Sequence, residues 1–263
     1  MSDYLESLFS LNGKTALVTG GGKGIGRMIA ESLLQAGARV YISSRSAEDC
    51  EAAAAEMAAL GDCRAYPYDL SQLNNIEALA GEIEAAGQGL HILVNNSGAT
   101  WGAPLDEFPE AGWDKVMNLN VKSPFFLIQK LLPLLRAAGT QEDPARVINI
   151  SSVAATMAGS QSAYSYMASK AAISHLTRGL AVDLAKQHIA VNSIAPGFFP
   201  SKMTSHMTTD EGLAFMRSLA PMGRIGEPQD IAGVMLLLCG AAGSFMTGAT
   251  IPIAGGMDLG AGY

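Results

Sequence analysis

Two hydrophobic patterns alternate along this chain, and their alternation most restricts its fold. Short apolar runs such as Ile92–Asn95 and Arg146–Ser151 are separated by longer amphipathic stretches rich in Ala and Leu. Strands joined by crossing helices favour a parallel sheet covered by helices on both faces, whose strands read as continuously apolar runs. We therefore predict an α/β fold: a single doubly wound Rossmann-type domain over residues 1–263, built on a seven-stranded parallel sheet.

The expected elements follow from these runs. The strand-like segments are Thr15–Thr19, Arg39–Ser43, Cys63–Tyr68, Ile92–Asn95, Arg146–Ser151, Ala190–Ala195 and Thr250–Ile253. The amphipathic segments are Arg27–Gln35, Glu48–Leu60, Ile76–Ala85, Trp113–Leu135, Tyr166–Ala185 and Asp230–Gly240. A connection at about 200–221 contains no strand and is long for a compact fold, so we expect a substrate lid there, with a plain surface helix-loop as the alternative.

Composition excludes several classes of protein. Hydrophobic residues make up 49% and charged residues 16% of the chain, so a large core is available. The net charge of −7 disfavours a nucleic-acid partner. No apolar run approaches the roughly 18 residues of a membrane span, and the first residues do not resemble a secretory signal. Cysteines and histidines are scattered without metal-ligand spacing. We expect a cytoplasmic protein without membrane contact or bound metal.

A glycine-rich stretch, Thr19–Gly26 (TGGGKGIG), joins the first strand to the first long helix. Gly20 allows a tight turn, Gly24 lets backbone approach a pyrophosphate, and Gly26 permits close packing of the helix on the strand. The helix N-terminus offers free N–H groups to phosphates. The spacing differs from the nucleotide-triphosphate loop, which argues against a kinase or ATPase. A dinucleotide site is the hypothesis, and a simple tight turn is the alternative.

The end of the second strand indicates which dinucleotide binds. An NAD site places an acid there to bind the adenosine ribose, but this chain has Ser44. Arg45 can bind a 2′-phosphate in a bidentate manner, and Lys23 can add a second positive charge. These residues favour NADP(H), with solvated surface cations as the alternative.

Tyr166 and Lys170 lie at i and i+4, on one face of a predicted helix. An unperturbed phenol titrates near ~10, and we expect the Lys170 ammonium to lower the pKa of Tyr166 so that it exchanges a proton with an alcohol oxygen. Tyr164 has Ala168 four residues later and gains no such partner. Ser151 and Ser152 follow a strand, where a hydroxyl can contact a reacting carbonyl.

Together these motifs resemble the short-chain dehydrogenase/reductase family over essentially the whole chain. The matching stretches are TGGGKGIG, Asp69–Leu70, NNSG at Asn95–Gly98, LNV at Leu119–Val121, ISS at Ile150–Ser152, YMASK at Tyr166–Lys170 and IAPG at Ile194–Gly197. The resemblance implies catalytic roles for Ser152, Tyr166, Lys170 and Asn120, with Asn120 supporting a proton relay through water to Lys170. It implies that Asn95 helps to hold the central sheet and the cofactor. The implied cofactor contacts are Gly20, Gly22, Lys23, Gly24, Ile25, Gly26, Ser44, Arg45, Asp69, Leu70, Asn96, Ser97, Gly98, Tyr166, Lys170, Pro196, Gly197 and Ser201.

Within the family, Thr100–Leu105, GWDKVMNLNV, LLPLLR and IAPGFFPSKMT resemble bacterial 3-oxoacyl reductases of the rhamnolipid-associated subgroup. We expect an enzyme that uses NADP(H) to interconvert a ketone and a secondary alcohol, reducing a 3-oxoacyl substrate. A polyol, sugar-acid or steroid alcohol dehydrogenase is the rival enzyme, and an NADP(H)-sensing regulator is the rival from another class. Met203, Met207, Phe215 and Met216 are candidates to line an acyl pocket or simply to pack. By the same resemblance we expect a homotetramer.

Overall fold

The computed structural model describes residues 3–157, 162–200 and 209–259. Seven strands form one sheet in the order β3-β2-β1-β4-β5-β6-β7, and every neighbouring pair is parallel. The strands are β1 Thr15–Thr19, β2 Arg39–Ser43, β3 Cys63–Tyr66, β4 Ile92–Asn95, β5 Ala145–Ile150, β6 Ile189–Pro196 and β7 Thr250–Ile253. The predicted fold class is therefore confirmed.

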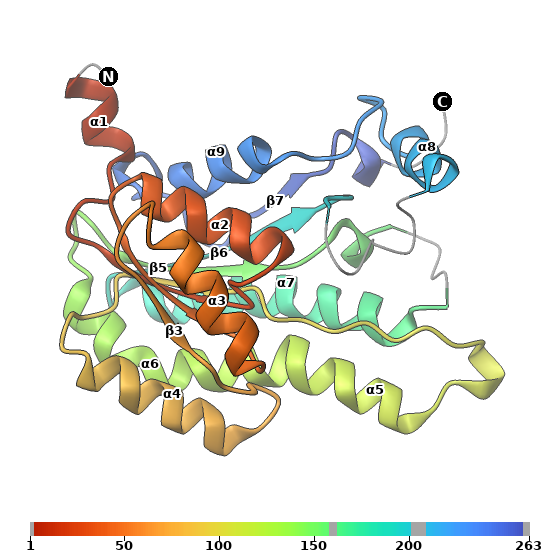
Figure 1. Cartoon of the computed structure of the whole chain (residues 1–263), viewed down its shortest axis with the longest axis horizontal. Coiled ribbons are helices and arrows are strands. Elements are labelled where there is room, and N and C mark those ends of the chain that lie inside the picture. The colour runs from red at the N-terminus through yellow and green to blue at the C-terminus, as the bar shows by residue number, and fades with distance from the viewer. Residues whose placement is uncertain (1–2, 158–161, 201–208, 260–263) are drawn as a thin grey trace.

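Helices cover both faces of this sheet (Figure 1). One layer comprises α2 Gly24–Gln35, α3 Ala47–Met57 and α9 Pro228–Cys239; the other comprises α4 Leu73–Ala85, α6 Ser123–Ala138 and α7 Tyr164–Ala185. Helices α5 Glu110–Met117 and α8 Asp210–Ser218 lie at the opposite end of the molecule from α1 Asp3–Phe9. In the described ranges, no helix is both long and apolar enough to span a membrane.

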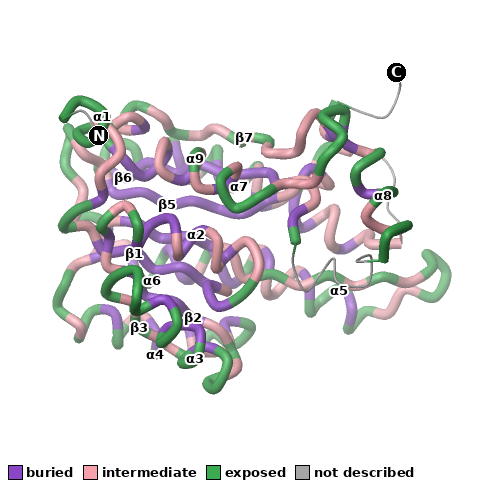
Figure 2. Tube along the Cα trace, turned by 45° about the horizontal axis from the view of Figure 1, so that its top comes forward, coloured by how far each residue is buried: buried purple, intermediate pink, exposed green. Residues whose placement is uncertain are grey.

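Burial on two sides explains the apolar strand sequences. Every residue of β1, β4, β5 and β6 is buried (Figure 2). Side chains alternate between the faces, so Val18 belongs to the core cluster under α2, α3 and α9, whereas Leu17 belongs to the cluster under α4, α6 and α7. The two clusters fix both helix layers against the sheet.

The strand order reverses between β1 and β4, which lie side by side although two strands separate them in sequence. In open α/β sheets, ligands bind at the carboxyl ends of the strands at such a reversal. Here β1 ends at Thr19 and β4 ends at Asn95. The glycine-rich turn and the stretch Asn95–Gly98 therefore begin at the same edge.

The predicted helix Trp113–Leu135 is helical throughout, but it is not α-helical throughout. Helix α5 ends at Met117, a π-helical turn spans Asn118–Lys122, and α6 follows. Asn120 lies in the π-helical turn, and its buried side chain is hydrogen-bonded to the Ala99 backbone. The turn thus coincides with a tertiary contact. Hydrophobic periodicity passes through such a turn without a visible break.

Polar side chains cross the sheet near the carboxyl ends of its strands. Ser43, Thr19, Asn95, Asn149 and Ser193 are all buried. Asn95 Nδ2 donates to Asn149 Oδ1 at 2.9 Å, and Ser193 Oγ donates to the Asn149 carbonyl at 3.0 Å. These bonds join β4, β5 and β6, in agreement with the expectation that Asn95 helps to hold the central sheet.

Thr177→Val is expected to destabilise the protein, because Asn149 Nδ2 donates to Thr177 Oγ1 at 2.9 Å in a buried setting. The isosteric change leaves that amide donor without its acceptor, at a cost of about 1–3 kcal/mol in the free energy of unfolding. Chemical denaturation measures the loss. Ser43→Ala is the control, because the buried Ser43 hydroxyl has no hydrogen-bond partner among the described residues and its removal should not reduce stability. Equal effects of the two variants would contradict the prediction.

Candidate active site

The glycine-rich turn has the geometry of a phosphate cradle. Gly20 and Gly24 have φ of +66° and +52°, a region that favours glycine. A Cβ on Gly26 would overlap the Gly20 carbonyl oxygen and Asn96 Nδ2, so Gly26 allows packing against the turn and Asn96 rather than against the strand. Helix α2 starts with no side chain capping its N-terminus. Its first N–H groups are therefore not bonded to a capping side chain.

The remaining residues of this turn contact neighbouring elements. A Cβ on Gly22 would lie 3.4 Å from that of Ala53 on α3, and Ile25 is partly buried against the core under α2. A Cβ at Gly22 would therefore make only ordinary van der Waals contact, while Ile25 anchors the first turn of the helix.

Thr19 joins the turn to the end of β4. Its Oγ1 accepts hydrogen bonds from the N–H groups of Asn96 and Ser97 at 2.9 and 3.0 Å, and donates to the Val94 carbonyl at 3.3 Å. Asn96 Nδ2 donates to the carbonyl of Thr19 at 2.9 Å. Two segments predicted to contact the cofactor are therefore held together by a threonine that sequence reasoning did not single out, although it stands first in TGGGKGIG.

The residues predicted to select NADP(H) lie around the end of β2. Ser44 is partly buried and Arg45 is exposed, with no hydrogen bond or ion pair to any described residue. Lys23 does not stand free as expected, because its Nζ lies 2.6 Å from Asp49 Oδ2 on α3. The acid that pairs with Lys23 belongs to the following helix, so strand-end reasoning did not reveal it.

Two of the implied cofactor contacts, Asp69 and Leu70, follow β3. Asp69 Oδ1 accepts from the Ser71 N–H at 3.0 Å, which orients its carboxylate at the start of the loop. Leu70 is buried in the core under α4, α6 and α7. Both residues lie at the carboxyl edge of the sheet, beyond the strand that pairs with β2.

Ser151 and Ser152 have different surroundings. Ser151 is buried, and its Oγ lies 2.9 Å from the Lys170 carbonyl and 2.6 Å from Ser174 Oγ. The hydroxyl of Ser152 forms a side-chain hydrogen bond with Tyr166 and accepts from the Ala154 N–H at 3.2 Å. The geometry supports Ser152, rather than Ser151, as the serine that faces the tyrosine.

Tyr166 and Lys170 lie on one face of α7, as their spacing predicted. Lys170 Nζ lies 5.5 Å from the centroid of the Tyr166 ring and donates to the Ile150 carbonyl at 2.8 Å. Tyr164 instead packs its ring edge-on against Phe108 at 5.8 Å. The two tyrosines therefore have different neighbours, and Tyr166 is the one beside Lys170, as its spacing predicted.

The direction of the Tyr166 pKa differs from the sequence expectation. Burial raises the pKa of Tyr166, and the hydrogen bond from Ser152 opposes that shift without reversing it. Burial also lowers the pKa of Lys170 to about 8, because its ammonium has left water and no described residue places a carboxylate beside it. In the polypeptide itself, desolvation therefore outweighs the effect expected of Lys170.

Asn120 lies beside this pair but uses its side chain structurally. Its Oδ1 accepts from the Ala99 N–H at 2.8 Å, and its Nδ2 donates to the Ala99 carbonyl and to Ser169 Oγ, both at 2.9 Å. A Cβ on Gly98 would lie 3.3 Å from Asn120 Oδ1 and 3.8 Å from Lys170 Nζ. The structure thus brings Gly98, Asn120 and Lys170 together, and the amide hydrogens of Asn120 are both committed.

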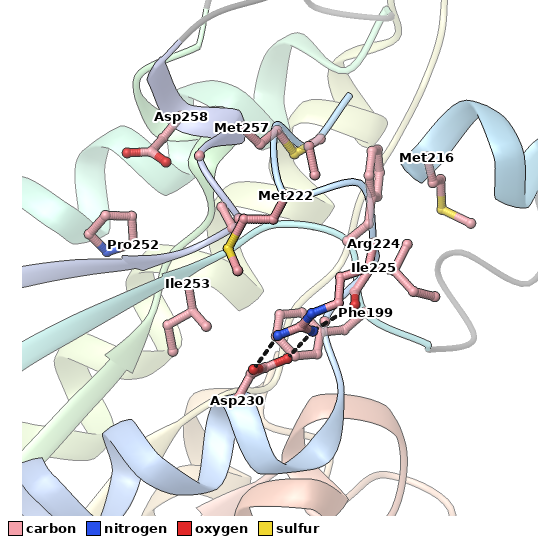
Figure 3. A pocket seen from close by; sticks show the side chains of 16 residues that line it. Phe199, Met216, Met222, Arg224, Ile225, Asp230, Pro252, Ile253, Met257 and Asp258 are labelled. Carbon is pink, nitrogen blue, oxygen red and sulfur yellow. Dashed lines mark hydrogen bonds and ion pairs between the residues drawn. The ribbon is translucent and has the colours of Figure 1, made fainter. Parts of the chain in front are cut away.

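A cavity of about 360 Å³ lies beside the end of β6 (Figure 3). Pro196 ends that strand, and a Cβ on Gly197 would lie 3.4 Å from the sulfur of Met257, which lines the cavity. Met216 also lines it, whereas Phe215 is 49% exposed. None of Ser152, Tyr166 and Lys170 is among its lining residues. Ser201, Met203 and Met207 lie outside the described residues, as do 201–208 of the expected lid.

One wall of this cavity contains an ion pair that sequence reasoning missed. Arg224 Nη1 and Nη2 lie 2.6 and 2.8 Å from the two carboxylate oxygens of Asp230. The carboxylate also accepts from the Glu227 N–H at the start of α9, and the guanidinium lowers the pKa of Asp230 to about 2. The ion pair fixes the segment between α8 and α9 to the first turn of α9, because Arg224 lies in that segment and Asp230 lies in α9.

Comparison with known proteins agrees with this geometry. A family model described as enoyl-(acyl carrier protein) reductase matches residues 20–258. A rhamnolipid-biosynthesis 3-oxoacyl-[acyl-carrier-protein] reductase of Pseudomonas aeruginosa is 52% identical, with 97% of this chain and all of that protein covered. The chain belongs to the short-chain dehydrogenase/reductase family. It is an oxidoreductase, as the resemblance predicted.

Two further relatives place the chain within this family. A solved complex of Pseudomonas aeruginosa RhlG with NADP superposes with a TM-score of 0.94 at 51% identity, covering 96% of this chain and 99% of that one. The 5-keto-D-gluconate 5-reductase of Escherichia coli is 35% identical over 96% of this chain and 98% of its own. Family members similar to this chain thus act on chemically different substrates.

The burial of Lys170 predicts a pH-dependent stability. Its pKa is lowered from 10.5 to about 8, so between these values the unfolded chain binds the proton that the folded chain has released. The free energy of unfolding then rises with pH across this window. The wild-type protein should gain stability relative to Lys170→Met between about pH 8 and 10.5, measured by denaturation at stepped pH. A constant difference between the two proteins would contradict the assignment.

Proposed function

We propose that this chain reduces a 3-oxoacyl substrate with NADPH, using Ser152 and Tyr166 as the groups that contact the reacting carbonyl. The supporting observation is that Ser152, Tyr166 and Lys170 meet at the sheet edge where the glycine-rich turn begins. When bound, NADPH supplies the hydride. The oxygen of the ketone gains negative charge in that reaction, and the protein must stabilise and protonate it.

The hydroxyl of Ser152 donates a hydrogen bond to the carbonyl oxygen and orients it. Tyr166 then donates its phenolic proton, and its raised pKa keeps that proton in place at neutral pH. Lys170 lies against the tyrosine ring with a pKa of about 8, so it exchanges protons near physiological pH. Asn120 holds the Ala99 backbone beside Tyr166 and Lys170. Both side-chain amide hydrogens of Asn120 already bond to Ala99 and Ser169, so any contribution of Asn120 to a proton relay must come from its other atoms.

The residues at the nucleotide end fit NADP(H). A Cβ on Gly20 or Gly26 would collide with Asn96, so these glycines let the turn pack closely against the segment after β4. The end of β2 offers Ser44 instead of an acid. Arg45 presents an exposed guanidinium, and Lys23 needs only to exchange its surface partner Asp49 for a phosphate. The relative solved with NADP supports the same cofactor.

Arg45→Ala should weaken NADPH binding by roughly tenfold, because charge-assisted hydrogen bonds to a phosphate are lost. The affinity for NADH should not change, since NADH has no 2′-phosphate. Titration of cofactor fluorescence measures both constants. Arg64→Ala is the control: Arg64 of β3 pairs with Asp62, so its loss should change the affinity for neither cofactor. An equal loss of affinity for NADPH and NADH in Arg45→Ala would show that Arg45 does not bind the 2′-phosphate.

The substrate class rests on the 52% identical relative and on the cavity beside Gly197. Its lining includes Met216, Met222 and Met257, flexible apolar side chains that suit an alkyl chain. We place the substrate lid at 200–221; its described residues are 200 and 209–221, which include α8. A sugar acid is the rival substrate, favoured by the 35% identical keto-gluconate reductase. A panel of 3-oxoacyl thioesters and keto acids, run with NADPH and NADH, separates the two.

Tyr166→Phe should reduce NADPH-dependent ketone reduction by at least about a hundredfold, since the proton donor is lost. Tyr164→Phe is the matched control on the same helix and should retain activity, because the Tyr164 ring packs on Phe108. Steady-state rates on the best substrate of the panel measure both. Near-normal reduction by Tyr166→Phe would refute the proposed role.

A homotetramer and a cytoplasmic location remain predictions. Val182 on α7 is 78% exposed and Phe245 is fully exposed, which supports burial of these apolar side chains between subunits. Sedimentation measures the assembly, and a stable monomer would rule out the tetramer.

A further inference from the structure

Ser169 stands between Tyr166 and Lys170 in the chain, and its hydroxyl bonds to groups of the protein itself. Its side chain is fully buried. Ser169 Oγ donates to the Tyr166 carbonyl at 2.7 Å and lies 2.9 Å from Asn120 Nδ2. A hydroxyl has one hydrogen, and that hydrogen is used on Tyr166, so the bond to Asn120 must be one that Ser169 accepts.

This acceptor completes the amide of Asn120. One Nδ2 hydrogen goes to the Ala99 carbonyl and the other to Ser169, while Oδ1 accepts from the Ala99 N–H. Without Ser169, a buried donor would lack a partner, which costs enough free energy to favour a displaced amide. The π-helical turn that contains Asn120 would then lose its direct bond to α7.

The same bonds connect the loop after β4 to the tyrosine. The loop contains Ser97 and Gly98, proposed to contact the cofactor, and continues into Ala99. Bonds run from Ala99 to Asn120, from Asn120 to Ser169, and from Ser169 to the Tyr166 backbone. Gly98 lies against Asn120 Oδ1 and Lys170 Nζ. Ser169 is thus the point where α7 is bonded to the segment that should present the cofactor.

We propose that Ser169 is a positioning residue, which acts through Asn120 to set the distance between Tyr166 and the loop at Ser97–Ala99. The inference rests on the proposed function, because it requires Tyr166 to be the proton donor. Proton transfer depends steeply on placement, whereas binding of cofactor and ketone uses many contacts that Ser169 does not make. Loss of the hydroxyl should therefore reduce kcat and leave the binding constants nearly unchanged.

Ser169→Ala tests this directly. We expect kcat to fall roughly tenfold, with KM for the ketone and the dissociation constant of NADPH changed by no more than about threefold. Ser165→Ala is the matched control: Ser165 is also fully buried on α7, four residues earlier, and its hydroxyl has no hydrogen-bond partner in the described chain. It should retain wild-type kcat. An unchanged kcat in Ser169→Ala, or an equal loss in both variants, would overturn the proposal.

Two further variants keep the test decisive if alanine impairs folding. Ser169→Thr and Ser169→Val have the same shape and differ only in the hydroxyl, so any crowding by the added methyl group is matched. The threonine variant should exceed the valine variant in kcat by roughly tenfold. Equal values in two folded variants would show that the hydroxyl has no such role.

Coupling to Asn120 provides a second criterion. If Ser169 acts through that amide, Ser169→Ala in an Asn120→Ala background should lower kcat by no more than about twofold. A full additional tenfold loss would show that the two residues act independently and would overturn the proposed route.

A readout without turnover separates this inference from the proposed function. Ala99 N–H is bonded to Asn120 Oδ1, so hydrogen exchange of the segment containing Ala99 should become faster in Ser169→Ala but not in Ser165→Ala. Unchanged exchange would contradict the proposal. A wild-type protein that reduces no ketone with NADPH would instead refute the proposed function and leave the exchange result standing.

Discussion

The hydroxyl of Thr19 is the interaction on which the site depends most directly. It bonds to three backbone groups at the end of β4, where the strand order reverses. Parallel strands have no hairpin to keep their carboxyl ends in register, so side chains at those ends must do so. Asn96 returns a bond to the glycine-rich turn, and Gly26 leaves room for it. The cradle and the loop after β4 therefore form one unit.

Burial controls the acid–base groups more than their mutual contact does. Lys170 has left water with one carbonyl as its hydrogen-bond acceptor, and its pKa falls to about 8. Burial raises the pKa of Tyr166, which favours the protonated phenol. A protonated tyrosine beside a readily titrating lysine suits proton delivery in the direction of ketone reduction. A bound nicotinamide with positive charge would favour the reverse direction, because it stabilises phenolate.

Hydroxyl groups organise the helix that presents these residues. Ser151 and Ser174 lie against the Lys170 carbonyl, Ser169 against the Tyr166 carbonyl, and Thr177 against Asn149. Ser174 and Ser169 bond to carbonyls of their own helix, whereas Ser151, Thr177 and the Ser169–Asn120 bond connect α7 to neighbouring elements. Helix α7 is therefore joined to the sheet and to the π-helical turn by polar bonds as well as by apolar burial.

Local patterns in the sequence were sufficient for the architecture and for the pairing of Tyr166 with Lys170. Strand burial leaves continuous apolar runs, a helix turn places i and i+4 on one face, and a tight turn requires glycine; each depends on neighbours in the chain. The π-helical turn within Trp113–Leu135, the pairing of Lys23 with Asp49 and the ion pair of Arg224 with Asp230 were not predicted. They depend on tertiary contacts or backbone geometry that local periodicity does not report. The direction of the Tyr166 pKa also came only from the tertiary structure, because desolvation is set by everything packed around a group and not by its spacing from a lysine.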